Sequence, residues 1–221
     1  RQLMNPILKI SNLLPAVFSG ERQRHTASAL WLRPEVTFEA GSRTMLRAQS
    51  GSGKTSLCAF IAGVRTDYEG SVEVDGRNVA SMSPAERITM RRDTVAWLPQ
   101  DMKLFPSLTA LENIELKNSL THHKTTGEIL EMLRMVGMED FADRKAGILS
   151  IGQQQRVAAV RALCQPFRLL LLDEPVSHLD ADANAAVARL IDREASAADA
   201  AVITTSVGND LALPCTLTIS L

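Results

Sequence analysis

A loop rich in glycine and serine that ends in lysine and threonine is the segment of this sequence best suited to bind phosphate. Glycines let successive backbone amides turn toward phosphate oxygens, and the N-terminus of a following helix adds partial positive charge. We expect Lys54 to reach the β- and γ-phosphates of a nucleotide, and the Thr55 hydroxyl to ligate Mg²⁺. The residues predicted to bind nucleotide are Ser50, Gly51, Ser52, Gly53, Lys54, Thr55 and Ser56. The pattern usually has glycine at position 48, where this chain has Ala48, and a left-handed angle there would strain the loop.

Two adjacent carboxylates, Asp173 and Glu174, follow the apolar run 169–172. The carboxyl ends of strands are where ligands of open α/β sheets bind, so Asp173 is placed to hold Mg²⁺ through water. Glu174 is then placed to polarise the attacking water as a general base. The two carboxylates could instead merely cap the strand, but the phosphate loop upstream favours the catalytic interpretation.

A serine followed by isoleucine, glycine and glutamine predicts a helix start at Ser150, about twenty residues before the paired carboxylates. Ser150 and Gln153 have the capping-box spacing, in which each side chain satisfies a free amide of the other residue. A serine-glycine helix start at this distance ahead of an Asp-Glu pair indicates an ATPase that works as a face-to-face dimer.

Short apolar or β-branched segments predict the strands that position these groups, at residues 7–10, 36–38, 44–46, 72–74, 169–172 and 201–204. Segment 169–172 is apolar on both faces, as expected of a central parallel strand covered by helices. Further capping boxes predict helix starts at Ser83 and Thr109. Residues 102–165 lack strand signals and contain apolar residues at helical spacing, Ile129, Met132, Leu133 and Val136, which we interpret as core.

These patterns predict an α/β fold with a doubly wound sheet, an antiparallel portion from the N-terminal region and an inserted helical lobe. The expected organisation is one domain over residues 1–221. Residues 1–101 and 166–221 form its core and β-subdomain, and residues 102–165 form the helical subdomain.

The composition is that of an ordinary globular protein, with 45% hydrophobic and 22% charged residues in a chain of 221. A net charge of −1 offers no electrostatic basis for binding nucleic acid, which we therefore do not expect as a partner. The three cysteines are far apart and lack metal-ligand spacing, so we expect reduced thiols in a cytosolic compartment. No apolar run approaches the roughly twenty residues of a membrane span, and no signal-peptide pattern begins the chain. Any role at a membrane is therefore expected from its aqueous side.

With these residues assembled, the chain resembles the nucleotide-binding subunits of ABC transporters over nearly its whole length. Lys54 and Thr55 resemble the end of the Walker A motif, residues 149–153 the LSGGQ signature, residues 169–174 Walker B, and residues 177–180 the D-loop. Gln100 resembles the Q-loop glutamine that senses Mg²⁺ and the γ-phosphate. The resemblance implies a P-loop NTPase with a RecA-like core, an antiparallel β-subdomain and a helical subdomain.

The same resemblance implies ATP and Mg²⁺ as ligands and a homodimer with two ATP molecules sandwiched between its subunits. Ser150, Gly152 and Gln153 would then contact the ATP of the partner. It also implies a membrane permease as partner and a cytoplasmic location, peripheral on the inner face of the cell membrane. Residues 91–92 and 104–113 are similar to the branch that energises lipoprotein-release, macrolide-export and cell-division permeases. Phe18 is either the aromatic residue that stacks on adenine or a core residue.

The departures from the family pattern concern hydrolysis. Ile151 replaces the first glycine of the signature pair and either projects away from the nucleotide or loosens the dimer. Ser206 stands where the family has its switch histidine, and Val207 where the family has aspartate. Serine donates one hydrogen bond but carries no charge, and losing a well-placed transition-state donor costs about 3 kcal/mol, or about a hundredfold in rate. We therefore expect slow hydrolysis.

Two other functions remain open. The replacements at positions 48, 151 and 206 also suit a nucleotide-gated switch that binds ATP, dimerises and hardly hydrolyses it. A soluble ABC protein of DNA repair or translation is disfavoured, because such proteins usually have tandem domains or long insertions and basic surfaces.

Overall fold

Two sheets of different kinds lie on opposite sides of helix α1 (Lys54–Ile61) in this computed structural model, which describes residues 6–47, 49 and 51–221. The first sheet is antiparallel, with strand order β2-β1-β4-β5. Its strands are β1 (Leu8–Pro15), β2 (Val36–Phe38), β4 (Tyr68–Val74) and β5 (Arg77–Asn78). The antiparallel contribution expected from the N-terminal region is therefore confirmed.

The second sheet is parallel, with strand order β6-β7-β8-β3-β9. Its strands are β3 (Arg43–Arg47), β6 (Val95–Leu98), β7 (Leu169–Asp173), β8 (Ala201–Ser206) and β9 (Leu217–Ser220). Every residue of β7 is buried, as expected of a strand with neighbours on both sides and helices over both faces. The register of β7 against β8 places Asp173 beside Thr205.

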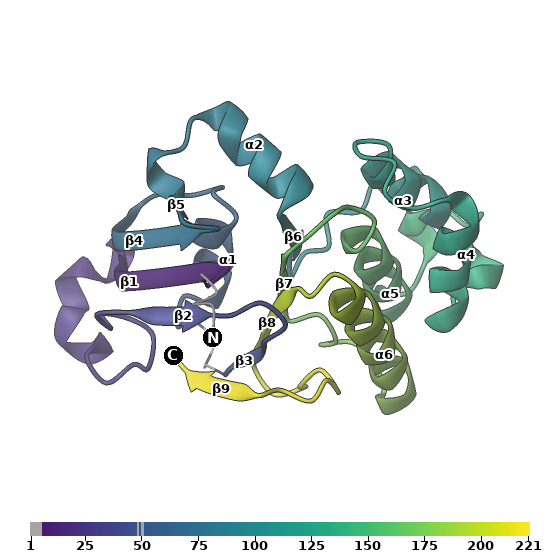
Figure 1. Cartoon of the computed structure of the whole chain (residues 1–221). Helices are drawn as coiled ribbons and strands as arrows, with labels where there is room; N and C mark the ends of the chain where they lie inside the picture. The colour runs from purple at the N-terminus through teal and green to yellow at the C-terminus, as the bar shows by residue number, and fades with distance from the viewer. Residues whose placement is uncertain (1–5, 48, 50) are drawn as a thin grey trace.

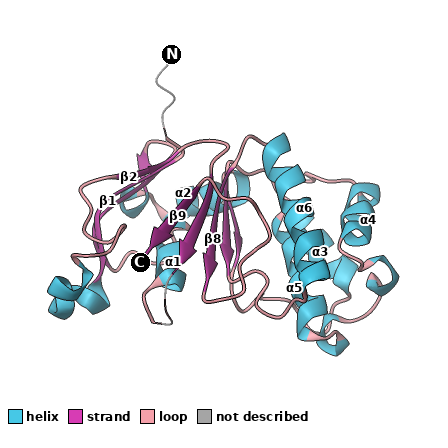
Figure 2. Cartoon of the chain, turned by 90° about the horizontal axis from the view of Figure 1, so that it is seen from below, coloured by secondary structure: helices cyan, strands magenta, loops and turns pink. Residues whose placement is uncertain are grey.

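Four helices lie on the side of the parallel sheet opposite α1, with α5 and α6 next to the sheet and α3 and α4 packed outside them, as Figures 1 and 2 show. They are α3 (Ala110–Asn118), α4 (Thr126–Met135), α5 (Ile151–Ala162) and α6 (Ala181–Ala197). Helix α2 (Pro84–Asp93) connects the antiparallel sheet to β6. Shorter 3₁₀ turns span Ala16–His25, Val79–Ser81, Glu139–Phe141 and Ala146–Ile148.

Side-chain caps set the starts of most of these helices. The predicted capping boxes are present at Ser83, Thr109 and Ser150, which confirms all three predicted helix starts. A fourth capping box joins Thr125 to Glu128 at the start of α4, and we did not identify it in the sequence. In each box a serine or threonine hydroxyl accepts from a backbone amide that has no partner within the helix.

Two hydrophobic cores stabilise the fold, one on each face of the parallel sheet. The first packs α1 against both sheets, and the second packs α3, α4, α5 and α6 against the opposite face. Ile129, Met132, Leu133 and Val136 belong to the second core and are at most 1% exposed, which confirms their interpretation as core. None of the helices in the described part of the chain is long and apolar enough to cross a membrane.

Candidate functional site

The phosphate loop leads directly into α1, as the sequence predicts. Gly51 and Gly53 have φ angles of 82° and 92°, in the left-handed region that glycine adopts without strain. A Cβ on Gly53 would lie 3.1 Å from the rings of both Phe18 and Trp31, so a larger residue there would require those rings to shift as well as a strained backbone. Lys54 is only 5% exposed, and its Nζ donates to the backbone carbonyl of Gln49 at 2.9 Å. Ala48 and Ser50, which the sequence places in this loop, lie outside the described residues.

A cavity of about 360 Å³ opens beside this loop and brings together residues from four parts of the sequence. Gln100 and Glu174 reach it from the ends of β6 and β7, and Gln100 Nε2 donates to Glu174 Oε2 at 3.2 Å. The cavity is therefore bounded by hydrogen-bond donors on one side and a carboxylate on the other. Its lining residues are Val17, Phe18, Gly51, Gly53, Lys54, Thr55, Ser56, Gln100 and Glu174.

Asp173 is the last residue of β7, directly before Glu174 of the cavity lining, and is 1% exposed. Its Oδ1 accepts a hydrogen bond from the Thr205 hydroxyl at 2.7 Å, while Oδ2 is buried with no partner among the described residues. A buried carboxylate oxygen without a donor fits a site that receives a cation or its bound water, because an unpaired buried charge is otherwise costly. Thr55 and Gln100 line the cavity and Asp173 precedes Glu174, which also lines it, so their oxygens suit Mg²⁺, and ligation by these three residues stays a prediction.

Glu174 has an unusual backbone conformation for a residue with a large side chain, with a φ angle of 52°. Such a conformation costs about 1–3 kcal/mol and persists only when its surroundings hold it. One of these restraints is Thr205, whose hydroxyl accepts from the Glu174 amide at 3.1 Å while it donates to Asp173. Thr205 thus links both carboxylate residues to the neighbouring strand. Thr205 is not among the site residues predicted from the sequence, although its place directly after the predicted strand 201–204 is a usable signal.

Phe18 lies both on the cavity wall and partly against the core. One face of its ring stacks on His25, with ring centroids 4.3 Å apart and planes inclined by 21°. Trp31 contacts it edge-on at 6.5 Å. Stacking on adenine stays a prediction for Phe18.

The signature residues lie at the start of α5 and do not contribute to the lining of this cavity in the described part of the chain. The Gln153 amide donates to the Ser150 hydroxyl at 3.2 Å, and the Ser150 amide donates to Gln153 Oε1 at 2.9 Å. Ile151 is 51% exposed at the helix start and projects into solvent in this single chain. A Cβ on Gly152 would lie 2.9 Å from the carbonyl oxygen of His178, so glycine is required there for packing within the chain itself.

Ser206 is buried at the end of β8 and is not among the residues that line the nucleotide cavity. Its hydroxyl accepts from the Gly208 amide at 3.1 Å and also hydrogen-bonds to Asp210. This bond, followed by pairing with Arg47, lowers the pKa of Asp210 despite partial burial of the carboxyl group. Ser206 lines a different cavity, of about 730 Å³, with Arg47 and Asp210. Its catalytic role stays a prediction that this arrangement does not support.

Comparison with known proteins gives one consistent result. A family model described as ABC transporter matches residues 33–177. An uncharacterized ABC transporter ATP-binding protein of Mycobacterium tuberculosis is 36% identical over 180 residues, which are 80% of this chain and 71% of that protein. The lipoprotein-releasing system ATP-binding protein LolD of Syntrophotalea carbinolica is 33% identical over 190 residues, which are 85% and 82% of the two chains. A solved dimer of the ATP-binding cassette MJ0796 in a post-hydrolysis state, bound to ADP and Pi, superposes with a TM-score of 0.76 at 25% identity and covers 91% of this chain and 88% of its own.

Proposed function

This chain belongs to the ABC transporter family of P-loop ATPases, and from that premise we propose that it binds and hydrolyses ATP to energise a membrane permease. The observation that carries the proposal is the meeting of the phosphate loop, Gln100 and Glu174 around one cavity, next in sequence to the buried carboxylate of Asp173. Lys54 and the loop amides hold the phosphates, and Glu174 accepts a proton from the attacking water. Mg²⁺, held by Thr55, Gln100 and Asp173, would neutralise charge on the phosphates. We place the protein on the cytoplasmic face of the membrane, attached through its permease.

The proposed active form is a homodimer that closes around two ATP molecules. Ser150 and Gly152 lie at an exposed helix start outside the cavity of their own chain, as suits residues that serve the nucleotide of a second copy. A helix N-terminus with a serine cap favours an anionic group, here the γ-phosphate of the partner's ATP. The solved MJ0796 cassette is likewise dimeric.

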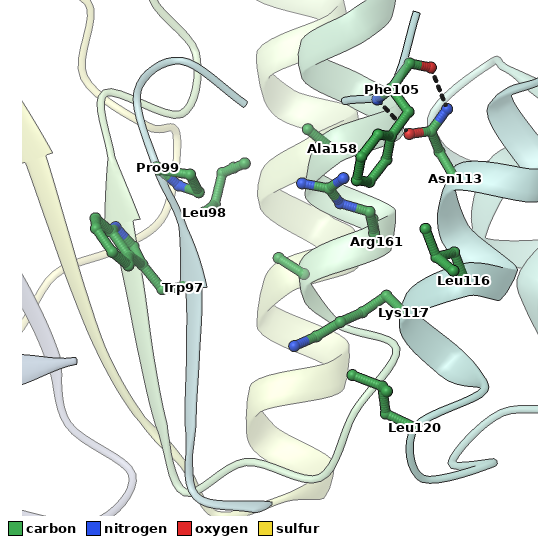
Figure 3. A pocket seen from close by; sticks show the side chains of 11 residues that line it. Trp97, Leu98, Pro99, Phe105, Asn113, Leu116, Lys117, Leu120, Ala158 and Arg161 are labelled. Carbon is green, nitrogen blue, oxygen red and sulfur yellow. Dashed lines mark hydrogen bonds between the residues drawn. The ribbon is translucent and has the colours of Figure 1, made fainter. Parts of the chain in front are cut away.

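The permease would dock in the groove between β6 and the helical lobe (Figure 3). This groove has a volume of about 280 Å³, and apolar side chains from β6, α3, α5 and the loops beside them form most of its lining. Arg161 and Lys117 extend toward the hollow. Burial first, and then repulsion from Arg161 and Arg91, lower the pKa of Lys117, so an acidic group on the occupant would be favourable. We therefore expect a short apolar segment of the permease that carries a carboxylate, in a permease of the lipoprotein-release or macrolide-export type.

The test of the catalytic assignment is vanadate-sensitive ATP turnover in the wild type and in Glu174→Gln. We expect turnover to fall by about a hundredfold or more in the variant, because the general base is removed. ATP binding, measured with a fluorescent nucleotide, should remain. Equal turnover in the two proteins would contradict the assignment.

The orientation of Ser206 supports a second candidate, a switch that closes on ATP and hydrolyses it very slowly. Its hydroxyl is engaged with Asp210 and Gly208 and does not line the nucleotide cavity. If a missing γ-phosphate contact limits the rate, Ser206→His should raise turnover. An unchanged rate in that variant would show that position 206 does not limit hydrolysis.

A further inference from the structure

The side-chain amide of Gln155 is buried between α5 and the loop that follows β7. Gln155 is only 3% exposed, and both the nitrogen and the oxygen of its side-chain amide form hydrogen bonds. Its Nε2 donates to the Ser177 hydroxyl at 2.9 Å and to the Glu174 carbonyl at 3.3 Å, while its Oε1 accepts from the His178 amide at 3.0 Å. A single side chain therefore connects three residues of the loop to the signature helix.

The Glu174 backbone is restrained from both sides. Thr205 accepts from its amide at 3.1 Å, and Gln155 donates to its carbonyl. A left-handed φ of 52° is unfavourable for glutamate unless neighbouring contacts impose it. These two side chains, with the Ser177 amide that donates to the same carbonyl at 3.5 Å, hold that backbone, and the Glu174 side chain accepts from Gln100 at the cavity.

Helix α5 approaches this loop more closely than a larger side chain would allow. Gly152 and Gln155 are three residues apart and so share one face of the helix. At Gly152 an added Cβ would lie 2.9 Å from the His178 carbonyl oxygen. The first turn of α5 thus carries Ser150 at its start and holds the Glu174 loop through Gln155.

We propose that Gln155 is a positioning residue for ATP hydrolysis, which fixes the backbone of Glu174 and connects it to the signature helix. The inference rests on the proposed function. It adds a physical connection, within one chain, between the residues that serve the chain's own ATP and those that serve the ATP of the partner. Ser150 serves the nucleotide of the partner, whereas Glu174 serves the chain's own nucleotide. Contact at Ser150 is transmitted to Glu174 through α5 and the Gln155 amide.

The test is Gln155→Met, which keeps the length of the side chain but removes its three hydrogen bonds. We expect kcat to fall by about tenfold, with KM for ATP and binding of a fluorescent nucleotide unchanged, because the side chain does not touch the nucleotide cavity. Gln154→Met is the matched control. Gln154 lies on the same helix and donates to the Leu149 carbonyl at 3.0 Å, and it makes no hydrogen bond to the loop, so this variant should keep its kcat.

A double-mutant cycle separates positioning from general stabilisation. If Gln155 acts through Glu174, Gln155→Met should leave the residual single-turnover rate of Glu174→Gln unchanged. Should Gln155→Met fail to fold, Ser177→Ala removes the 2.9 Å bond from Gln155 together with the 3.0 Å contact between the Ser177 hydroxyl and Nδ1 of the exposed His178, and it should lower kcat by about two- to threefold.

Three results would overturn the inference. The first is a wild-type kcat in Gln155→Met, and the second is a loss of kcat in Gln154→Met equal to that in Gln155→Met. The third is that Gln155→Met lowers the single-turnover rate of Glu174→Gln by the same factor as it lowers that of the wild type. Any of these, with wild-type turnover still abolished by Glu174→Gln, leaves the proposed function intact. A wild type whose turnover is the same as that of Glu174→Gln overturns the proposed function, and this inference with it.

Discussion

Replacing Thr205 with valine would remove the hydroxyl that joins Asp173 and Glu174 while preserving the shape of the side chain. The hydroxyl donates to Asp173 Oδ1 at 2.7 Å and accepts from the Glu174 amide at 3.1 Å, in a site that is 1% exposed. Because Oδ2 of Asp173 already lacks a partner among the described residues, the variant would leave this carboxylate without either contact.

The size of the effect follows from the two bonds. A hydrogen bond to a charged group contributes about 1.5–3 kcal/mol and one between neutral groups about 1 kcal/mol. The two share one hydroxyl, so they are not fully additive, and we expect the free energy of unfolding to fall by about 2–4 kcal/mol. The free energy of unfolding of a typical domain is about 5–15 kcal/mol, so most of the protein should remain folded. We also expect kcat to fall by about tenfold or more, because the Glu174 amide loses its hydrogen bond to Thr205.

Thr204→Val is the matched control, since Thr204 precedes Thr205 on the same buried strand. Its hydroxyl is buried with no partner among the described residues, so removing it should be neutral or stabilising by about 1 kcal/mol. The assays are urea unfolding at pH 7 without nucleotide, and ATP turnover. Equal effects of the two valine substitutions on stability would refute the reasoning, because they would show that the bridging hydroxyl is worth no more than the unpaired one.

Gly152→Ala should destabilise the fold by about 1–3 kcal/mol, because its Cβ would lie 2.9 Å from a backbone oxygen. The control Gly127→Ala places a Cβ on α4 whose nearest neighbour is Thr125 Oγ1 at 4.0 Å, an ordinary contact, and should be slightly stabilising. Thermal melts that rank the two variants the other way would contradict this expectation. The hydrogen bond from Ser206, and next the pairing with Arg47, hold the pKa of Asp210 below its usual value. The ionised carboxylate therefore stabilises the folded protein at pH values above its unfolded pKa of about 3.9. This stabilisation is lost as the pH falls through the pKa of Asp210 in the folded protein. The stability advantage of the wild type over Ser206→Ala should accordingly be full above about pH 4 and shrink below it in urea unfolding, and a difference that stays constant across this range would count against the Asp210 bond. Lys117→Glu reverses the charge of a groove residue with no ion-pair partner among the described residues, so it should release the permease in co-purification and leave ATP turnover of the isolated subunit unchanged. Retention of the permease would argue against an acidic occupant of the groove.

Much of the fold could be predicted from the sequence, because its signals are local. A capping box joins residues three positions apart, so Ser83, Thr109 and Ser150 identify helix starts without knowledge of the rest of the chain. The same pattern was present at Thr125 and was overlooked. An apolar segment such as residues 169–172 predicts a buried strand from its own composition.

The sequence by itself determined which residues can bind phosphate and where the two carboxylates follow a strand. Only the tertiary structure decided how those groups are held, because their partners are distant in the chain. Thr205 reaches Asp173 across 32 residues through the register of two parallel strands. Gln155 reaches Glu174 across 19 residues through the packing of α5 on the loop after β7. Ser206 likewise faces Asp210 and not the nucleotide cavity, because side chains alternate between the two faces of a strand and only the assembled sheet shows which face each one meets.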